Sequence, residues 1–196
     1  METQLLTTAT VVALCAAAGV RAYLPLLAMG VAARMGVLPL QPGYEWLTST
    51  PLLIGLAVLA AVELLADKVP GLDHVNDAVH TVVRPLSGAL IFALSNNVVS
   101  AHSLPAAVIA GLALAGGVHA TKATIRPVVT ASTIGMGNPV VSLFEDLGVT
   151  GMIILAFVLP LVALLLTMGL IALSVWALSK LFRRRPRPIP GRRLPT

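Results

Sequence analysis

Long apolar runs alternate with short polar segments along most of the chain. Residues 3–33 carry a single charge, Arg21, and further apolar runs cover residues 51–66, 85–101, 104–121 and 148–181. A helix rises about 1.5 Å per residue, so about 20 apolar residues cross the roughly 30 Å hydrocarbon core of a bilayer. The pattern therefore predicts an all-α integral membrane protein with about five transmembrane helices.

Several of these runs contain residues that predict broken or re-entrant segments. Gly19 and Pro25 flank Arg21 and favour a break in the first helix, predicted over residues 6–33. Residues 71–83 have an apolar side and a polar side, which predicts an amphipathic helix at the membrane surface or re-entering it. Residues 128–144 carry no charge and are rich in Gly, Pro and hydroxyl side chains, which favours a re-entrant segment. The last run exceeds the bilayer thickness, so it must tilt, kink at Pro160 or project from the membrane.

The distribution of basic residues predicts the orientation. Seven of the 13 Lys and Arg residues lie within residues 180–196. By the positive-inside rule this end is cytoplasmic, and five spans then place the N-terminus outside. Segment 34–50 would be inside, and segments 67–84 and 122–147 outside. We expect one polytopic domain over residues 1–181 of a multi-pass protein of the cell (inner) membrane. Residues 182–196 form a Pro/Arg-rich tail, predicted to be disordered and to contact anionic lipids.

The composition supports this assignment and excludes other classes. Hydrophobic residues make up 57% of the 196 residues and charged residues 11%, against roughly 45–50% and about 25% in soluble domains. A soluble enzyme and a disordered protein are excluded, and one cysteine excludes a disulfide framework. The net charge of +5 arises from the tail, so no nucleic-acid partner is expected. Because five helices enclose little space, we expect a homo-oligomer.

Charged residues within the apolar runs or close to their ends are the candidates for function. A charge at the bilayer centre costs roughly 2.5–3.5 kcal/mol on insertion scales, so such residues need a partner, a wet cavity or a ligand. The residues predicted to line a substrate or proton pathway are Arg21, Glu63, Asp67, Lys68, Arg84, His119, Lys122 and Arg126. A structural salt bridge from Arg21 to Glu63 or Asp67 is the alternative. Glu145 and Asp146 are interpreted as an acidic cap before the last helix.

A second group has the ligand types of a divalent metal site. Asp73, Asp77 and His80 follow i, i+4, i+7 spacing and would share one stripe of a helix. Carboxylate and imidazole groups bind divalent cations, so a divalent metal is a candidate cofactor. Proton transfer, or a solvated face with local ion pairs, fits the same pattern. No catalytic motif is present, so no catalytic residue is predicted.

Two stretches carry a resemblance to a known family. These are residues 19–30, Gly-Val-Arg-Ala-Tyr-Leu-Pro-Leu-Leu-Ala-Met-Gly, and the block formed by Glu63, Asp67-Lys68-x-Pro70, Asp73, Asp77 and Arg84-Pro85. They resemble small bacterial integral membrane proteins of the family domain of unknown function 4126, over roughly residues 8–180. The resemblance implies one compact polytopic domain and marks the same polar positions. It implies no activity.

Three functions are compatible with the sequence. The first is a membrane transporter or channel for a small ion, an anionic solute or a lipid phosphate, with the Arg and carboxylate residues lining its pathway. The second is a metal-dependent membrane-embedded enzyme acting on a lipid, with Asp73, Asp77 and His80 joined by Glu63 or Asp67. The third is a scaffold subunit without a substrate. We expect the first, and therefore no enzyme activity.

Overall fold

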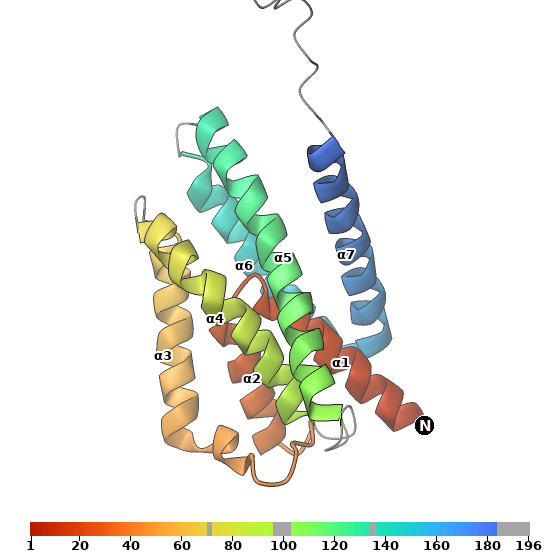
Figure 1. The fold of residues 1–196 in the computed structure, drawn as a ribbon. Coiled ribbons are helices and arrows are strands. Elements are labelled where there is room, and N and C mark those ends of the chain that lie inside the picture. The colour runs from red at the N-terminus through yellow and green to blue at the C-terminus, as the bar shows by residue number, and fades with distance from the viewer. Residues whose placement is uncertain (70–71, 96–102, 134–135, 184–196) are drawn as a thin grey trace, which may run out of the picture.

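Seven α-helices form the bundle that the computed structural model describes for residues 1–69, 72–95, 103–133 and 136–183 (Figure 1). Proline lies in the first turn of α3, α6 and α7, where its missing N–H is not needed by the helix. The helices, with one short 3-10 helix η1, are α1 Glu2–Ala18, α2 Tyr23–Arg34, η1 Glu45–Thr48, α3 Thr50–Ala66, α4 Leu72–Leu94, α5 Leu104–Thr133, α6 Asn138–Val158 and α7 Pro160–Arg183.

The chain direction alternates from α3 to α7, whereas α1 and α2 form a pair that enters the bundle and returns (Figure 1). α1 runs from the N-terminus to the middle of the bundle, and α2 leads back to the end at which α3 begins. There the Arg34 guanidinium donates to Thr50 Oγ1 at 2.9 Å. One end of the bundle therefore holds residue 1 and residues 35–49. The other end holds the end of α3, the start of α6 and the end of α7.

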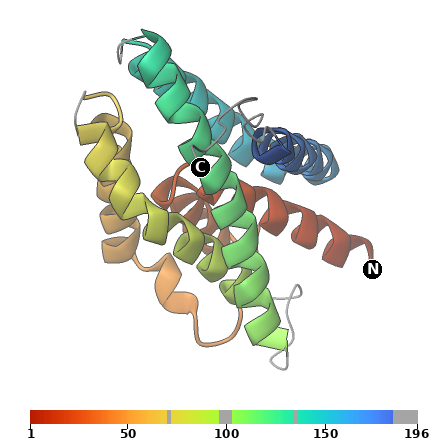
Figure 2. The same cartoon turned by 45° about the horizontal axis from the view of Figure 1, so that its top comes forward.

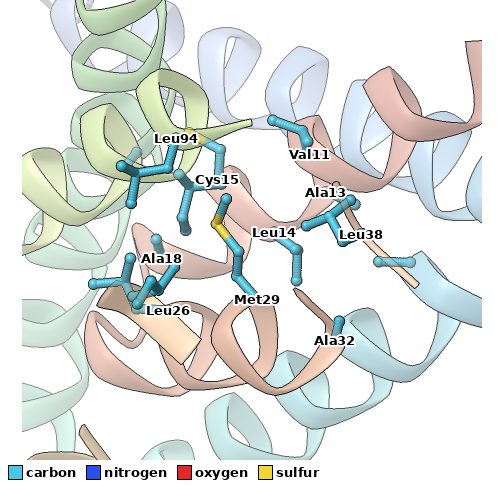
Figure 3. Close-up of a cluster of buried hydrophobic side chains, with 14 of the residues drawn as sticks. Val11, Ala13, Leu14, Cys15, Ala18, Leu26, Met29, Ala32, Leu38 and Leu94 are labelled. Carbon is cyan, nitrogen blue, oxygen red and sulfur yellow. The ribbon is translucent and has the colours of Figure 1, made fainter. Parts of the chain in front are cut away.

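Helix α1 occupies the centre of the bundle, where its small side chains allow close packing. Its residues Val11, Ala13, Leu14, Cys15 and Ala18 are fully buried, and they form the main hydrophobic cluster with residues of α2 and α4 (Figure 3). Thr10 Oγ1 donates to the backbone oxygen of Ala156 in α6 at 2.8 Å. The first helix in the sequence is thus surrounded by helices that follow it.

Helices α4 and α5 cross at two glycines. A Cβ atom on Gly111 would overlap the backbone of Gly88, and one on Gly88 would overlap Ala115 and the Gly111 carbonyl. The thiol of Cys15 lies 3.6 Å from the Gly88 oxygen and 3.5 Å from the Gly111 oxygen. Small residues at such crossings allow backbones to approach closely, as in other helix pairs packed in lipid.

The distribution of side chains is inverted relative to a soluble protein. Arg21, Glu63, Asp67 and Arg84 are at most 1% exposed, whereas large apolar side chains such as Leu165 at 72% cover the outer faces. Residues 75–94, 104–133 and 138–158 form three helices long and apolar enough to cross a membrane. An apolar exterior of this extent is stable in a bilayer and aggregates in water. The fold is consistent with a membrane protein.

In the first half of the chain the structure agrees with one prediction and differs from another. The first apolar run forms α1 and α2 with a break around Arg21, as Gly19 and Pro25 suggested. The predicted amphipathic helix at 71–83 and the run from Pro85 instead form one helix, α4. Proline is tolerated inside α4 because packing against α5 holds the helix on both sides of it.

The helices of the C-terminal half differ more from the prediction than those of the N-terminal half. Helix α5 extends through Pro127 to Thr133, and α6 begins at Asn138, so most of the segment predicted to re-enter is helical. Residues 134 and 135 lie outside the described ranges. Residues 148–181 do not form one kinked helix, because Leu159 has non-helical dihedral angles and Pro160 begins α7 (Figure 2). This reversal brings α7 back to the end of the bundle where α3 ends. The sequence predicts the tail from residue 182, but α7 extends to Arg183; residues 184–196 lie outside the described residues.

Candidate functional site

The site is built around the break between α1 and α2. Residues 19–22 leave the helical path at mid-bundle, and Arg21 within them is fully buried. Gly19 is required here because a Cβ atom would overlap the Ala115 carbonyl and Val118 of α5. The glycine thus lets the break approach α5, where two further cations lie.

Opposite charges face the two helix ends at this break. The carboxylate of Glu63 accepts hydrogen bonds from the backbone N–H of Ala22 at 3.0 Å and of Tyr23 at 3.3 Å, at the start of α2. The ammonium of Lys122 donates to the Val20 oxygen at 3.4 Å, just after α1. An anion at a helix N-terminus and a cation at a C-terminus are both favoured by the helix dipole. The backbone N–H groups of Ala22 and Tyr23 and the carbonyl of Val20 therefore have charged partners at the break.

Arg21 joins three elements of the bundle. Its guanidinium pairs with Asp67, which follows α3, and with Asp146 of α6. It also donates to Ser142 Oγ of α6 at 2.9 Å. A buried arginine is stable only when its donors are satisfied and its charge is compensated, and these contacts supply both.

Asp67 lies where three cations converge. Its Oδ2 atom contacts Arg21, the Lys122 ammonium at 3.3 Å and the Arg126 guanidinium at 3.0 Å, while Asn76 donates to its Oδ1 atom. Burial alone would raise the pKa of Asp67, but Lys122, Arg21 and Arg126 outweigh it and hold this pKa well below its usual range. Asp67 is therefore a carboxylate throughout the physiological pH range.

Arg84 of α4 extends the network toward two histidines. It contacts Glu63 at 3.4 Å and Asp77 at 3.1 Å, and donates to His119 Nδ1 at 2.9 Å. Because arginine can only donate, His119 Nδ1 accepts, which places its proton on Nε2, 3.3 Å from Thr81 Oγ1. His80 Nδ1 lies 2.7 Å from the Asn76 oxygen, and its Nε2 lies 3.4 Å from Glu63.

Three carboxylates at the more accessible side complete the set. Asp77 contacts Arg126 at 2.8 Å, and Glu145 contacts Lys122 at 2.9 Å and Arg126 at 3.1 Å. Asp146 pairs with Lys68. We call the whole set the ionic network: the cations Arg21, Lys68, Arg84, Lys122 and Arg126 with the carboxylates Glu63, Asp67, Asp77, Glu145 and Asp146. Five positive and five negative formal charges balance.

Two cavities adjoin the ionic network on different sides. The first, which we call the Arg126 cavity, is about 380 Å³ and is lined by Asp77, Arg126, Pro127, Thr130 and Asn138. The second, the α7 cavity, is about 310 Å³ and lies between α1, α5, α6 and α7. Its walls are mainly apolar, with Lys122, Glu145 and three hydroxyl side chains as the polar lining residues. The contacts of Arg126 with Glu145 and of Lys122 with Asp77, at 3.9 Å, connect the two sides.

The structure brings all eight predicted pathway residues together. Seven are members of the ionic network, and His119 contacts it through Arg84. The interpretation of Glu145 and Asp146 as a cap before the last helix is wrong, because α6 begins at Asn138 and directs both into the network. A charge count could have found them: five cations within the apolar runs or close to their ends need more carboxylates than Glu63, Asp67 and Asp77 provide. Asn76 and Ser142 carried no such signal.

The predicted metal ligands are only partly placed. Asp77 pairs with two arginines, and His80 lies beside Asn76 and Glu63. The side chain of Asp73 lies outside the described residues. Among the side chains that the structure describes, no group of three His, Cys, Asp or Glu residues is arranged to hold a metal ion. The metal site therefore stays a prediction.

Comparison with known proteins gives a family and no activity. No curated protein and no solved structure was found to match the chain. The model of one family, described as Domain of unknown function (DUF4126), matches residues 8–180, a range that includes every member of the ionic network. This match covers most of the 196 residues and agrees with the resemblance seen in the sequence. The chain belongs to the DUF4126 family.

Proposed function

We propose that this protein is a membrane transporter for an anionic solute, and that the ionic network is the barrier its substrate must pass. The observation that carries the proposal is the position of the network between two cavities. Arg126 and Asp77 line the Arg126 cavity, and Lys122 and Glu145 line the α7 cavity. A solute that crosses from one cavity to the other would meet these four side chains in succession.

The cost of the network argues for a role beyond stability. Desolvation of buried ion pairs often exceeds their mutual attraction, and apolar replacements of similar size are frequently as stable. Three buried nitrogens of the described residues, Arg84 Nε, Arg126 Nε and His80 Nε2, also have no hydrogen-bond partner. Intramembrane charges at broken helices are the usual elements of substrate pathways.

The pairing suggests how an anion would bind. Asp77 and Glu145 have side chains 23% and 15% exposed, whereas Asp67 is fully buried. We expect a substrate anion to take the place of these two outer carboxylates on Lys122 and Arg126. Asp67 would remain and hold the cations in position while the outer pairs exchange.

The arrangement of the helices also suggests an orientation. We propose that α3 to α7 cross the membrane while α1 and α2 enter from one side and return. The basic residues after Ser179 then place the end of α7 in the cytoplasm and residue 1 outside. With this orientation the turn at Pro160 lies outside and Asp67 lies on the cytoplasmic half. It reverses the sides expected from the sequence for segments 34–50, 67–84 and 122–147, because α1 and α2 together do not cross the membrane.

Flux through proteoliposomes tests the proposal. Purified protein would be reconstituted, and currents recorded on a solid-supported membrane for acetate, octanoate, phosphate and chloride gradients. We expect a current for at least one anion that is lost in Lys122→Gln and Arg126→Gln. Arg34→Gln is the matched control, because Arg34 lies at the other end of the bundle beside Thr50. Absence of current for all four anions, or equal current in both network variants, would refute the proposal.

A further inference from the structure

The α7 cavity has features that the transport of a small hydrophilic anion does not explain. Its walls are mainly apolar along α1, α5, α6 and α7. Its volume of about 310 Å³ is at the lower end of the roughly 300–1,000 Å³ typical of small-molecule sites. Ile125 and Gly148, both lining residues, are exposed, so the cavity is open to the outer surface of the bundle.

One region of this cavity is charged. Lys122 is 7% exposed and lies at the cavity wall beside Glu145, at 2.9 Å. The wall has three hydroxyl side chains, those of Thr121, Thr167 and Ser174. Thr121 Oγ1 donates to the Gly117 oxygen, and Thr167 Oγ1 lies 3.8 Å from Met152 Sδ. An apolar chamber with one buried cation at its inner side complements a hydrocarbon chain that ends in an anionic group.

We propose that the α7 cavity binds a single-chain amphiphilic anion, with its hydrocarbon chain among α1, α5, α6 and α7 and its carboxylate or phosphate group on Lys122. This assignment rests on the proposed function for the exchange of carboxylates at Lys122, and it names the class of substrate. When Glu145 separates from Lys122, its negative charge is still compensated by Arg126, which lies 3.1 Å away. The ligand group would then occupy the position that Glu145 leaves.

Two glycines of α6 provide a matched pair of variants. Gly148 lines the α7 cavity, and a Cβ atom there would meet nothing within 4 Å, so the first atom of a larger side chain has room. We expect the bulk of leucine at this lining position to obstruct the cavity. Gly151 has the same open surroundings on the same helix and is not a lining residue of this cavity. Both substitutions replace glycine with a stronger helix former, so neither is expected to unfold α6.

Photolabelling tests the proposal. The protein in phosphatidylcholine nanodiscs would be irradiated with dodecanoic acid carrying a terminal diazirine, or with its methyl ester, and the labelled peptides identified by mass spectrometry. We expect the acid to label cavity-lining residues such as Met152 and Leu170, with labelling lost in Gly148→Leu and retained in Gly151→Leu. The ester, and the acid with Lys122→Gln, should label about tenfold less, since a charge-assisted hydrogen bond contributes about 1.5 kcal/mol or more.

The outcomes separate this proposal from the transport proposal. Equal labelling by acid and ester, or labelling unchanged by Gly148→Leu, would overturn the amphiphile site. An acetate or phosphate current that is lost in Lys122→Gln and Arg126→Gln and kept in Arg34→Gln would leave the transport proposal standing in that case. Specific labelling of the cavity without any anion current would refute transport and leave the amphiphile site in place.

Discussion

The convergence of three cations on Asp67 allows a quantitative prediction. Asp67→Asn keeps the size of the side chain and removes its charge. Breaking a buried ion pair costs about 3–5 kcal/mol when the remaining charge has no other partner. Here Arg21 keeps Asp146, Lys122 keeps Glu145 and Arg126 keeps Asp77. We therefore expect a loss at the lower end, about 3 kcal/mol, which corresponds to a melting temperature roughly 6–12 °C lower for a chain of this length.

A second substitution separates charge compensation from packing. Arg126→Gln in the Asp67→Asn background restores equal numbers of positive and negative charges in the ionic network. Residues in one ion-pair network show interaction energies of roughly 0.5–3 kcal/mol. The double variant should therefore lose less stability than the sum of the losses in the two single variants. Thermal denaturation in detergent, followed by size-exclusion chromatography, measures this. Strictly additive losses would refute compensation by charge. Glu2→Gln, at an exposed position of α1, is the control.

The same comparison has a defined dependence on pH. The pKa of Asp67 is held below the ordinary value of 3.8 in the folded protein, so its stabilising contribution is fully present above that value. The contribution is lost as the pH falls from 3.8 through the folded-state pKa. The difference in melting temperature between the parent protein and Asp67→Asn should thus be constant near neutral pH and narrow only in strong acid. A difference that already narrows near neutral pH would contradict the assignment.

Further predictions concern other contacts of the bundle. Glu63→Gln should lower stability by about 3 kcal/mol in the same thermal assay, since it removes the charge facing the start of α2. Gly111→Val should lower the free energy of unfolding by at least about 1–3 kcal/mol, because the valine side chain would overlap Gly88. Gly117→Ala should instead be neutral or stabilise by up to about 1 kcal/mol, as a Cβ atom there meets nothing within 4 Å. Lys68→Gln should change stability by at most about 1 kcal/mol, because this partly exposed side chain is solvated; a larger loss would place Lys68 among the essential cations.

The sequence predicted the buried charges better than the course of the chain. Hydrophobic runs and the cost of intramembrane charge sufficed to select residues that are up to 105 positions apart, from Arg21 to Arg126, and that meet in space. The residues at which the helices begin and end were harder to predict from the sequence. Pro85 and Pro127 favour helix ends locally, but each lies inside a helix held by its neighbours, whereas Pro160 begins a new helix. Local sequence does not distinguish these cases, because the packing partners decide them.

The parts of the site that the sequence missed have a common cause. Glu145 and Asp146 lie between apolar residues near glycines, and this context is equally typical of a helix start. Only the return of α6 against the break at Arg21 gives them their partners. The predicted homo-oligomer and the predicted metal stay predictions, because the contacts among the described residues test neither of them.

The central position of α1 sets a condition on how the protein is made. Ribosomal synthesis delivers α1 and Arg21 first, whereas Asp67, Lys122 and Asp146, which surround the break, emerge dozens of residues later. The first helix therefore obtains its polar partners only after the later helices have been made. A chain cut before α6 would therefore contain Arg21 but lack Ser142 and Asp146, two of its partners.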